Sequence, residues 1–193
     1  MMRCWQTVAL LMAALATFSV EAAEWQALST SSVSYVSIKN NVVAENNRFT
    51  SVTGNITSKG EATLSIDLSS VETQVDIRNQ RMREVFFEVD QYPEARITGQ
   101  LSPQDMAQIE SGAPLEIDLP LSLSLHGVSA EVIAKLRAAK VGQRLWVTTR
   151  EPVLISAGDF GLGAGVTALQ ELAGLSAIAS TVPVTIDIRF QTK

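Results

Sequence analysis

The sequence has little of the chemistry that most enzymes use, because it contains one cysteine, Cys4, and one histidine, His126. Covalent catalysis needs a nucleophile with a base beside it, and zinc sites are usually built from several cysteines and histidines. His126 precedes Gly127 at the end of a predicted strand, where a structural role is the better interpretation. Carboxylates such as Glu88 and Asp90 lie in polar sequence that is typical of solvated loops. We therefore expect no catalytic centre, no metal site and no cofactor.

The chain also lacks an apolar run long enough to cross a membrane as a helix. Its longest such run, residues 8–20, is shorter than the roughly 20 residues that a spanning helix needs. Arg3 precedes this run and small residues follow it, which is typical of a secretory signal peptide. We predict a signal peptide over residues 1–22 and a domain over residues 23–193 that is exported to the periplasm and is not an integral membrane protein. Cleavage would remove Cys4, so no disulfide is expected.

Charged and aromatic side chains are both scarce, at 18% and 6% of the residues, and the formal net charge is −5. A surface that binds nucleic acid or anionic lipid usually carries an excess of basic residues, so neither partner is expected. An outer-membrane barrel needs girdles of aromatic residues at both interfaces, which this composition does not favour. The hydrophobic content of 46% is nevertheless sufficient for one domain with a full core.

What the sequence does contain is a regular alternation of apolar and polar residues. In residues 115–125, LEIDLPLSLSL, a leucine or isoleucine occupies every second position. Successive side chains of a strand leave opposite faces of the sheet, so this pattern predicts a long strand with one apolar and one solvated face. Such a strand needs either a second packed sheet or closure of its own sheet into a barrel.

The same alternation recurs and predicts an all-β domain of about eight strands. Strands are expected at residues 33–38, 49–57, 62–68, 95–101, 115–125, 128–139, 145–149 with a continuation at 152–156, and 182–190. Residues 128–139 also allow a helix as an alternative. Two or three short helices are expected in the connections, within residues 71–85, over residues 103–110 behind an N-cap at Ser102, and from Thr167 to Gly174.

Prolines and glycines mark special positions in this pattern. Pro120 and Pro183 fall on outward-facing positions of strands, where a missing N–H indicates an edge, an end or a bulge. If their two strands were neighbours, the sheet would close there. The glycine-rich residues 158–165 lack the lysine of a phosphate-binding P-loop, so Asp159 is expected to hold this loop by hydrogen bonds.

Five segments together resemble one known family. They are IDLSSVET (66–73), RNQRM (78–82), FFEVDQYPEA (86–95), LHGV (125–128) and GDFGL (158–162). This combination is similar to the YceI-like family of exported bacterial lipid-binding proteins, over nearly the whole mature chain. The resemblance implies a lipocalin-like, eight-stranded antiparallel β-barrel whose interior holds one polyisoprenoid or similar amphiphile.

The chain departs from the family pattern near its loops. Asn79 stands where the family usually has aspartate, and Arg81 and Met82 stand where it has histidine and leucine. These changes concern the headgroup of a ligand more than the apolar wall. Guanidinium groups match phosphate oxygens, so Arg78, Arg81 and Arg83 are candidate headgroup ligands, although a solvated loop is the simpler interpretation.

The side chains at the inward-facing positions of the predicted strands are aliphatic, and they indicate which class of ligand the interior would bind. Such a wall favours a long hydrocarbon over a polar metabolite, because it buries methylene groups and satisfies no polar group. The candidate ligand-binding residues are Tyr35, Leu64, Ile66, Leu68, Leu119, Leu121, Leu123, Val184, Ile186 and Ile188, with Phe86, Phe87, Tyr92 and Phe160 near the ends of a tunnel. We expect a carrier or store of a polyisoprenoid, an isoprenoid quinone or a fatty-acyl lipid. The alternative is a non-enzymatic accessory protein whose barrel is filled by its own side chains.

Overall fold

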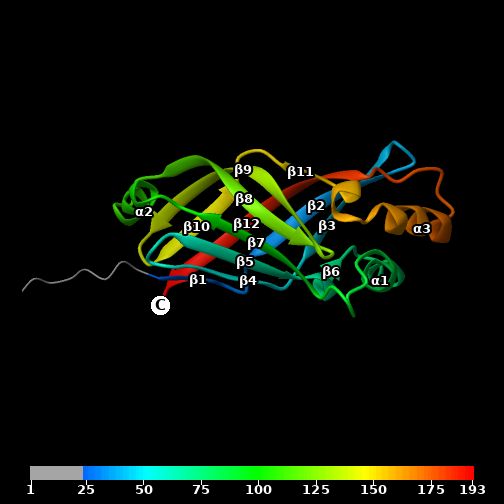
Figure 1. Cartoon of the computed structure of the whole chain (residues 1–193), viewed down its shortest axis with the longest axis horizontal. Helices are drawn as coiled ribbons and strands as arrows, with labels where there is room; N and C mark the ends of the chain where they lie inside the picture. Colours follow the sequence, from blue (N-terminus) through cyan, green and yellow to red (C-terminus); the bar gives the residue numbers. More distant parts are fainter. Residues whose placement is uncertain (1–23) are drawn as a thin grey trace, which may run out of the picture.

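A computed structural model describes residues 24–193 as an antiparallel β-barrel (Figure 1). The predicted signal peptide lies outside the described residues and stays a prediction. The strands are β1 (Trp25–Ala27), β2 (Ser32–Lys39), β3 (Val43–Phe49), β4 (Val52–Ile56), β5 (Glu61–Asp67), β6 (Val71–Glu72), β7 (Glu94–Gln100), β8 (Leu115–Leu125), β9 (Val128–Val141), β10 (Arg144–Thr149), β11 (Val153–Ser156) and β12 (Thr181–Thr192). The helices are α1 (Asp76–Arg81), α2 (Pro103–Glu110) and α3 (Gly163–Ala173).

These segments form eight long strands, because some of the strands bend and are interrupted. β1 and β2 both pair with β12 on one side. On the other side, β1 pairs with β4 and β2 pairs with β3. β5 and β6 likewise continue one another, as do β10 and β11. Each long strand therefore pairs with its neighbours in sequence, and the first closes the ring on the last. The predicted eight-stranded barrel is confirmed, and the alternative of two packed sheets is wrong.

Side chains satisfy the backbone where the strands bend. Between β1 and β2, the hydroxyl of Ser31 donates to the carbonyl of Arg189 at 3.3 Å and accepts from its N–H at 3.0 Å. Between β5 and β6, the carboxylate of Asp67 accepts from the N–H of Ser69 at 2.9 Å and caps a short 3-10 helix. Polar side chains thus replace ladder hydrogen bonds at the breaks in the sheet.

The strand with the clearest alternation folds as expected. Along β8, Leu115, Leu119 and Leu123 are buried, whereas Glu116 and Ser122 are exposed. β9 pairs with every residue of β8, so the alternative of a helix over residues 128–139 is wrong. The alternating burial confirms that one face of β8 meets the interior of the barrel.

Two local predictions were wrong. Residues 43–49, VAENNRF, form β3 although they do not alternate, because β2 supplies backbone hydrogen bonds along their whole length. The expected strand 49–57 therefore joins the end of β3 to all of β4. Helix α3 begins at Gly163 and not at Thr167, whose hydroxyl donates back to the carbonyl of Gly163 within the helix at 3.4 Å. Gly174 ends α3 in the left-handed conformation, as predicted.

The two prolines do not mark the closure of the barrel. β8 and β12 are not neighbours, so the predicted seam is wrong, and closure runs along β12 with β1 and β2. Pro120 is paired only with Ile133, and Pro183 only with Leu154. Each proline therefore sits where the ladder has a partner on one side only, as expected for a residue without an N–H.

The connecting helices lie at opposite ends of the barrel (Figure 1). Helix α2 lies at the end that also holds the C-terminus, and α1 and α3 lie at the other end. Ser102 and Asp105 form a reciprocal capping box at the start of α2, and Met106 and Ile109 bury its inner face. Among residues 24–193, no helix has the length and apolar character to cross a bilayer.

Candidate functional site

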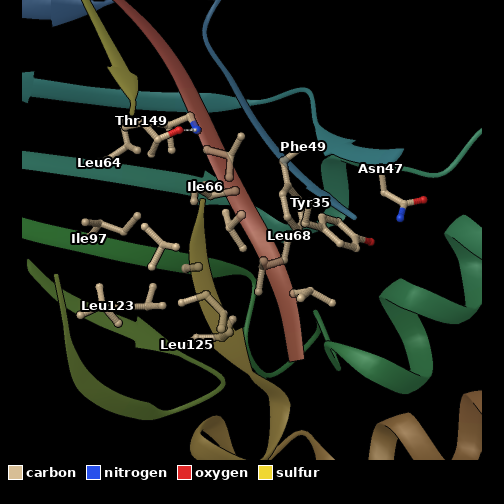
Figure 2. Close-up of a pocket in the computed structure, with 18 of the residues that line it drawn as sticks. Tyr35, Asn47, Phe49, Leu64, Ile66, Leu68, Ile97, Leu123, Leu125 and Thr149 are labelled. Atoms are coloured by element: carbon tan, nitrogen blue, oxygen red, sulfur yellow. Dashed lines mark hydrogen bonds between the residues drawn. The ribbon is translucent and has the colours of Figure 1, made fainter. Parts of the chain in front are cut away.

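The barrel encloses a cavity of about 630 Å³ (Figure 2). This volume lies in the range of about 300–1,000 Å³ that is usual for small-molecule sites. The wall extends from Leu101 and Ile109 beside α2 to Ile77 in α1 and Leu172 in α3. The cavity therefore runs the length of the barrel, and the interior is not filled by the protein's own side chains.

All but two of the residues predicted to contact a ligand line this cavity. They are Tyr35, Leu64, Ile66, Leu68, Phe86, Phe87, Leu119, Leu121, Leu123, Val184, Ile186 and Ile188. They come from β2, β5, β8, β12 and the short helices after β5 and α1, and the inward phase of each strand places them there. The alternation in the sequence therefore placed most of its candidates in the wall, while contact with a ligand stays a prediction.

Tyr92 and Phe160 lie outside the cavity wall, contrary to the prediction. The ring of Tyr92 packs on the ring of His126, with centroids 4.2 Å apart, and Nε2 of His126 lies 2.8 Å from a carboxylate oxygen of Glu88. Phe160 is 2% exposed within a 3-10 helix that precedes α3. Packing against other parts of the protein removes both aromatic side chains from the interior, and His126 has the structural role that the sequence indicated.

The three predicted arginines separate into different positions. Arg78 and Arg81 line the cavity, whereas Arg83 does not. Nη1 of Arg78 lies 2.7 Å from a carboxylate oxygen of Glu45, and Nζ of Lys39 lies 2.6 Å from the same oxygen. Burial raises the pKa of Glu45, but the hydrogen bond from Lys39 and the charge of Arg78 outweigh this and hold that pKa below its ordinary value. Glu45 is therefore ionised at neutral pH.

The charged part of the wall is confined to the end beside α1. Four charged residues belong to the wall, namely Lys39, Glu45, Arg78 and Arg81. The side chain of Arg81 makes no ion pair or hydrogen bond with any residue in 24–193. Because three of the four side chains are basic, this end of the wall carries an excess of positive charge in a protein whose net charge is −5.

A few uncharged polar groups lie beside this charged end. Asn47 is 4% exposed, and its Nδ2 donates to Oγ of Ser37 at 3.0 Å and to the carbonyl of Glu45 at 3.2 Å. Its Oδ1 is buried without a partner. Burial also raises the pKa of Tyr35 well above its ordinary value, so its hydroxyl stays protonated. Figure 2 shows both residues at one end of the cluster of aliphatic side chains.

The candidates chosen from the sequence include no wall residue of β4, β7, α2, β9, β10 or β11, and two further parts of the wall were also missed. One is β3, which supplies Glu45, Asn47 and Phe49. The other is α3 with the segment after it, from which apolar residues including Leu169 and Leu172 reach the cavity. The apolar composition of residues 162–179 was a signal for the second part, whereas the polar sequence of β3 offered none.

The cavity opens between α1 and α3. Three large apolar residues of the wall are also exposed to solvent: Val75 (39%), Ile77 (53%) and Leu172 (50%). At the opposite end Trp25 is completely buried, and α2 covers the barrel. The arrangement is a tunnel with one closed end and one mouth, in which charged groups occur only near the mouth.

Comparisons with known proteins agree with this geometry. The model of the YceI-like domain family matches residues 16–190. A polyisoprenoid-binding domain from Saccharophagus degradans, implicated in plant cell wall breakdown, is 35% identical, with a TM-score of 0.84 over 89% of this chain and 99% of that chain. BcnA from Burkholderia cenocepacia is 20% identical, with a TM-score of 0.64 over 82% of this chain and 95% of that one. A Campylobacter jejuni YCEI protein is 14% identical, with a TM-score of 0.56 over 76% and 84% of the two chains. The curated proteins yielded no match.

Proposed function

Because the chain belongs to the YceI-like family, we propose that it binds one long apolar amphiphile inside its barrel and carries or stores it in the periplasm. The observation that carries this proposal is the hollow, aliphatic interior of about 630 Å³ with a mouth at one end. Candidate ligands are a polyisoprenoid, an isoprenoid quinone and a fatty-acyl lipid. The signal-peptide pattern of residues 1–22 supports export.

The chemistry of the wall favours a hydrocarbon chain. Each methylene group that leaves water for such a wall gains about 0.8 kcal/mol, so a chain of many carbons would bind strongly. A polar metabolite would lose its hydrogen bonds to water and find few replacements, because the wall's polar groups are concentrated beside the mouth. The 35%-identical domain from Saccharophagus degradans, which binds polyisoprenoids, supports the same class of ligand.

Binding, and not catalysis, is the function that this arrangement supports. Within residues 24–193, no group of three or more histidine, cysteine, aspartate or glutamate residues is placed to hold a metal ion. His126 contacts Glu88 and Tyr92 outside the cavity, so it is not directed at a ligand there. The polar groups that do line the cavity are suited to holding the head of an amphiphile.

Arg81 is the first candidate for contact with an anionic headgroup. Glu45 already accepts from Arg78, and Arg83 lies outside the wall, whereas Arg81 lines the cavity without an ion-pair partner in residues 24–193. Arg81→Gln should weaken binding of a polyprenyl phosphate more than binding of the polyprenol of equal length, and added salt should reduce the difference. Equal losses for the two ligands would remove Arg81 from this role.

Extraction of the purified protein with organic solvent, followed by mass spectrometry, tests the main proposal. We expect one class of long-chain lipid in near-stoichiometric amount. Leu121→Trp should fill the tunnel and abolish co-purification, because the side chain of Leu121 points into the cavity. Ser122→Trp is the matched control, since Ser122 lies on the outer face of the same strand. A wild-type protein that extracts empty and takes up no added lipid would overturn the proposal.

A further inference from the structure

Exposed aliphatic side chains gather around the mouth of the cavity. We call Val42, Val43, Val75, Ile77 and Leu172 the rim patch; their side chains are 81%, 45%, 39%, 53% and 50% exposed. They make up half of the large apolar residues that are exposed in the described part of the chain. Exposed apolar groups that cluster in this way usually mark an interaction site.

Three segments that are distant in sequence bring the rim patch together. The turn between β2 and β3 holds the segment after α3, because Oδ1 of Asn40 accepts from the N–H and the hydroxyl of Ser176, both at 2.9 Å. Helix α3 packs on the π-helical turn that continues α1, where a side chain at Gly165 would come within 3.0 Å of Phe86. Figure 1 shows α1, α3 and the β2–β3 turn at the same end of the barrel.

We propose that the rim patch docks on the surface of a lipid bilayer, so that a lipid chain passes between the bilayer and the cavity without crossing water. This inference rests on the proposed function. Val75, Ile77 and Leu172 belong both to the rim patch and to the cavity wall, so the apolar surface is continuous from the outside to the interior. Exposure of a long chain to water is unfavourable for every methylene group, which makes transfer through solvent very slow.

The composition of the rim patch favours lipid over a protein partner. No exposed aromatic residue of the described chain lies beside the rim patch, whereas the strongest contacts in protein interfaces are enriched in tryptophan and tyrosine. The net charge of −5 opposes attraction to a strongly anionic membrane, and the local excess of positive charge at the mouth belongs to the cavity wall, where Lys39 and Arg78 are paired with Glu45. The structure therefore points to shallow apolar insertion into a bilayer of low surface charge.

Transfer of a fluorescent polyprenol from vesicles of phosphatidylcholine and phosphatidylethanolamine to the protein tests this inference. The variant Val42→Asp with Val43→Asp should slow transfer about tenfold or more, because two aliphatic side chains that do not line the cavity no longer enter the lipid. The matched control is Ile133→Asp with Leu154→Asp, whose residues are 65% and 69% exposed but lie outside the rim patch. The control should transfer at the wild-type rate. Equal rates for the two variants would overturn the inference.

Delivery of the same polyprenol from detergent separates docking from binding. The rim variant should then load as fully as the wild type, because no bilayer is involved. If it loads poorly, Val42→Asp alone decides in its place, because this change lies outside strand β3 and outside the cavity wall. Failure of the wild type to load from detergent would overturn the proposed function itself. In that case, flotation of the wild type with ligand-free vesicles still tests docking, and no flotation would overturn it.

Discussion

The two ends of the barrel are built in opposite ways. At the end beside α2, Trp25 and Leu145 are completely buried, and Nζ of Lys140 lies 5.4 Å from the centre of the Trp25 ring. At the mouth, large apolar side chains are exposed and polar groups supply the buried contacts. Oδ1 of Asn79, for example, accepts from the N–H and the hydroxyl of Thr73, both at 2.7 Å. Apolar packing, with one ion pair between Lys140 and Glu110, closes one end, whereas hydrogen bonds and ion pairs around an opening shape the other.

This difference fits a barrel that exchanges a ligand through one end. An end sealed by packed side chains resists opening, because opening it would expose the core to water. An end shaped by hydrogen bonds holds the opening in place without filling it, and it leaves apolar side chains free to contact lipid. Four measurements test this difference between the closed end and the mouth.

The largest effect is expected at the closed end. Trp25→Ala should lower the free energy of unfolding by about 3–5 kcal/mol, because the side chain is completely buried and leaves a void. Leu172→Ala at the mouth should change it by less than about 0.5 kcal/mol, since that side chain is half exposed. Urea unfolding measures both values, with Trp146→Ala as a control for loss of an exposed tryptophan. Similar losses for Trp25→Ala and Leu172→Ala would contradict the comparison.

The polar end should depend on Asn79. Asn79→Ala leaves the N–H and hydroxyl of buried Thr73 without their acceptor, which should cost about 1–3 kcal/mol. The loss should be local, with faster amide hydrogen exchange in residues 72–82 and unchanged exchange in β8. Asn46→Ala serves as a control, because Asn46 is an exposed residue of strand β3. Uniformly faster exchange across the barrel would show that the mouth is not an independent unit.

A smaller effect is expected from the helix caps. The capping box at Ser102 fixes the start of α2, whereas α3 at the mouth begins at Gly163, and Leu162 before it provides no side-chain cap. Ser102→Ala should cost about 1 kcal/mol and make amide exchange in the first turn of α2 as fast as in α3. Exchange in α2 that is unaffected by this change would mean that packing of Met106 and Ile109 alone holds the helix.

The smallest effect concerns the pH dependence of the mouth. The pKa of Glu45 is lowered in the folded protein, so its ion pairs with Lys39 and Arg78 stabilise the fold fully at neutral pH. This contribution is lost as the pH falls below the ordinary glutamate value of 4.5 and through the lowered pKa. An NMR titration of the Glu45 carboxylate should give a midpoint below 4.5, and Arg78→Gln should raise it. An unchanged midpoint in that variant would show that Arg78 does not act on Glu45.

How far the sequence allowed prediction depended on whether a strand alternates. β8 and β12 alternate strictly, and both were placed correctly with their inward residues. β3 does not alternate, because Glu45 and Asn47 face inward toward the mouth, and it was missed together with the polar part of the site. The polar region of the wall was therefore the least predictable, since it breaks the pattern that identifies a strand.

The alternation in the sequence was enough to predict an all-β domain whose strands have one aliphatic face, because it assigns each residue of a strand to one face. The barrel was implied by the family resemblance, and the pairing of β12 with β1 and β2 decided it over two packed sheets. The sequence also determined which leucines and isoleucines of β5, β8 and β12 face inward. Only the tertiary structure decided that the barrel has one mouth, that Arg83 points away from it and that Tyr92 packs on His126 instead of lining the cavity. These features depend on contacts between segments far apart in the chain, and no local pattern of residues encodes them.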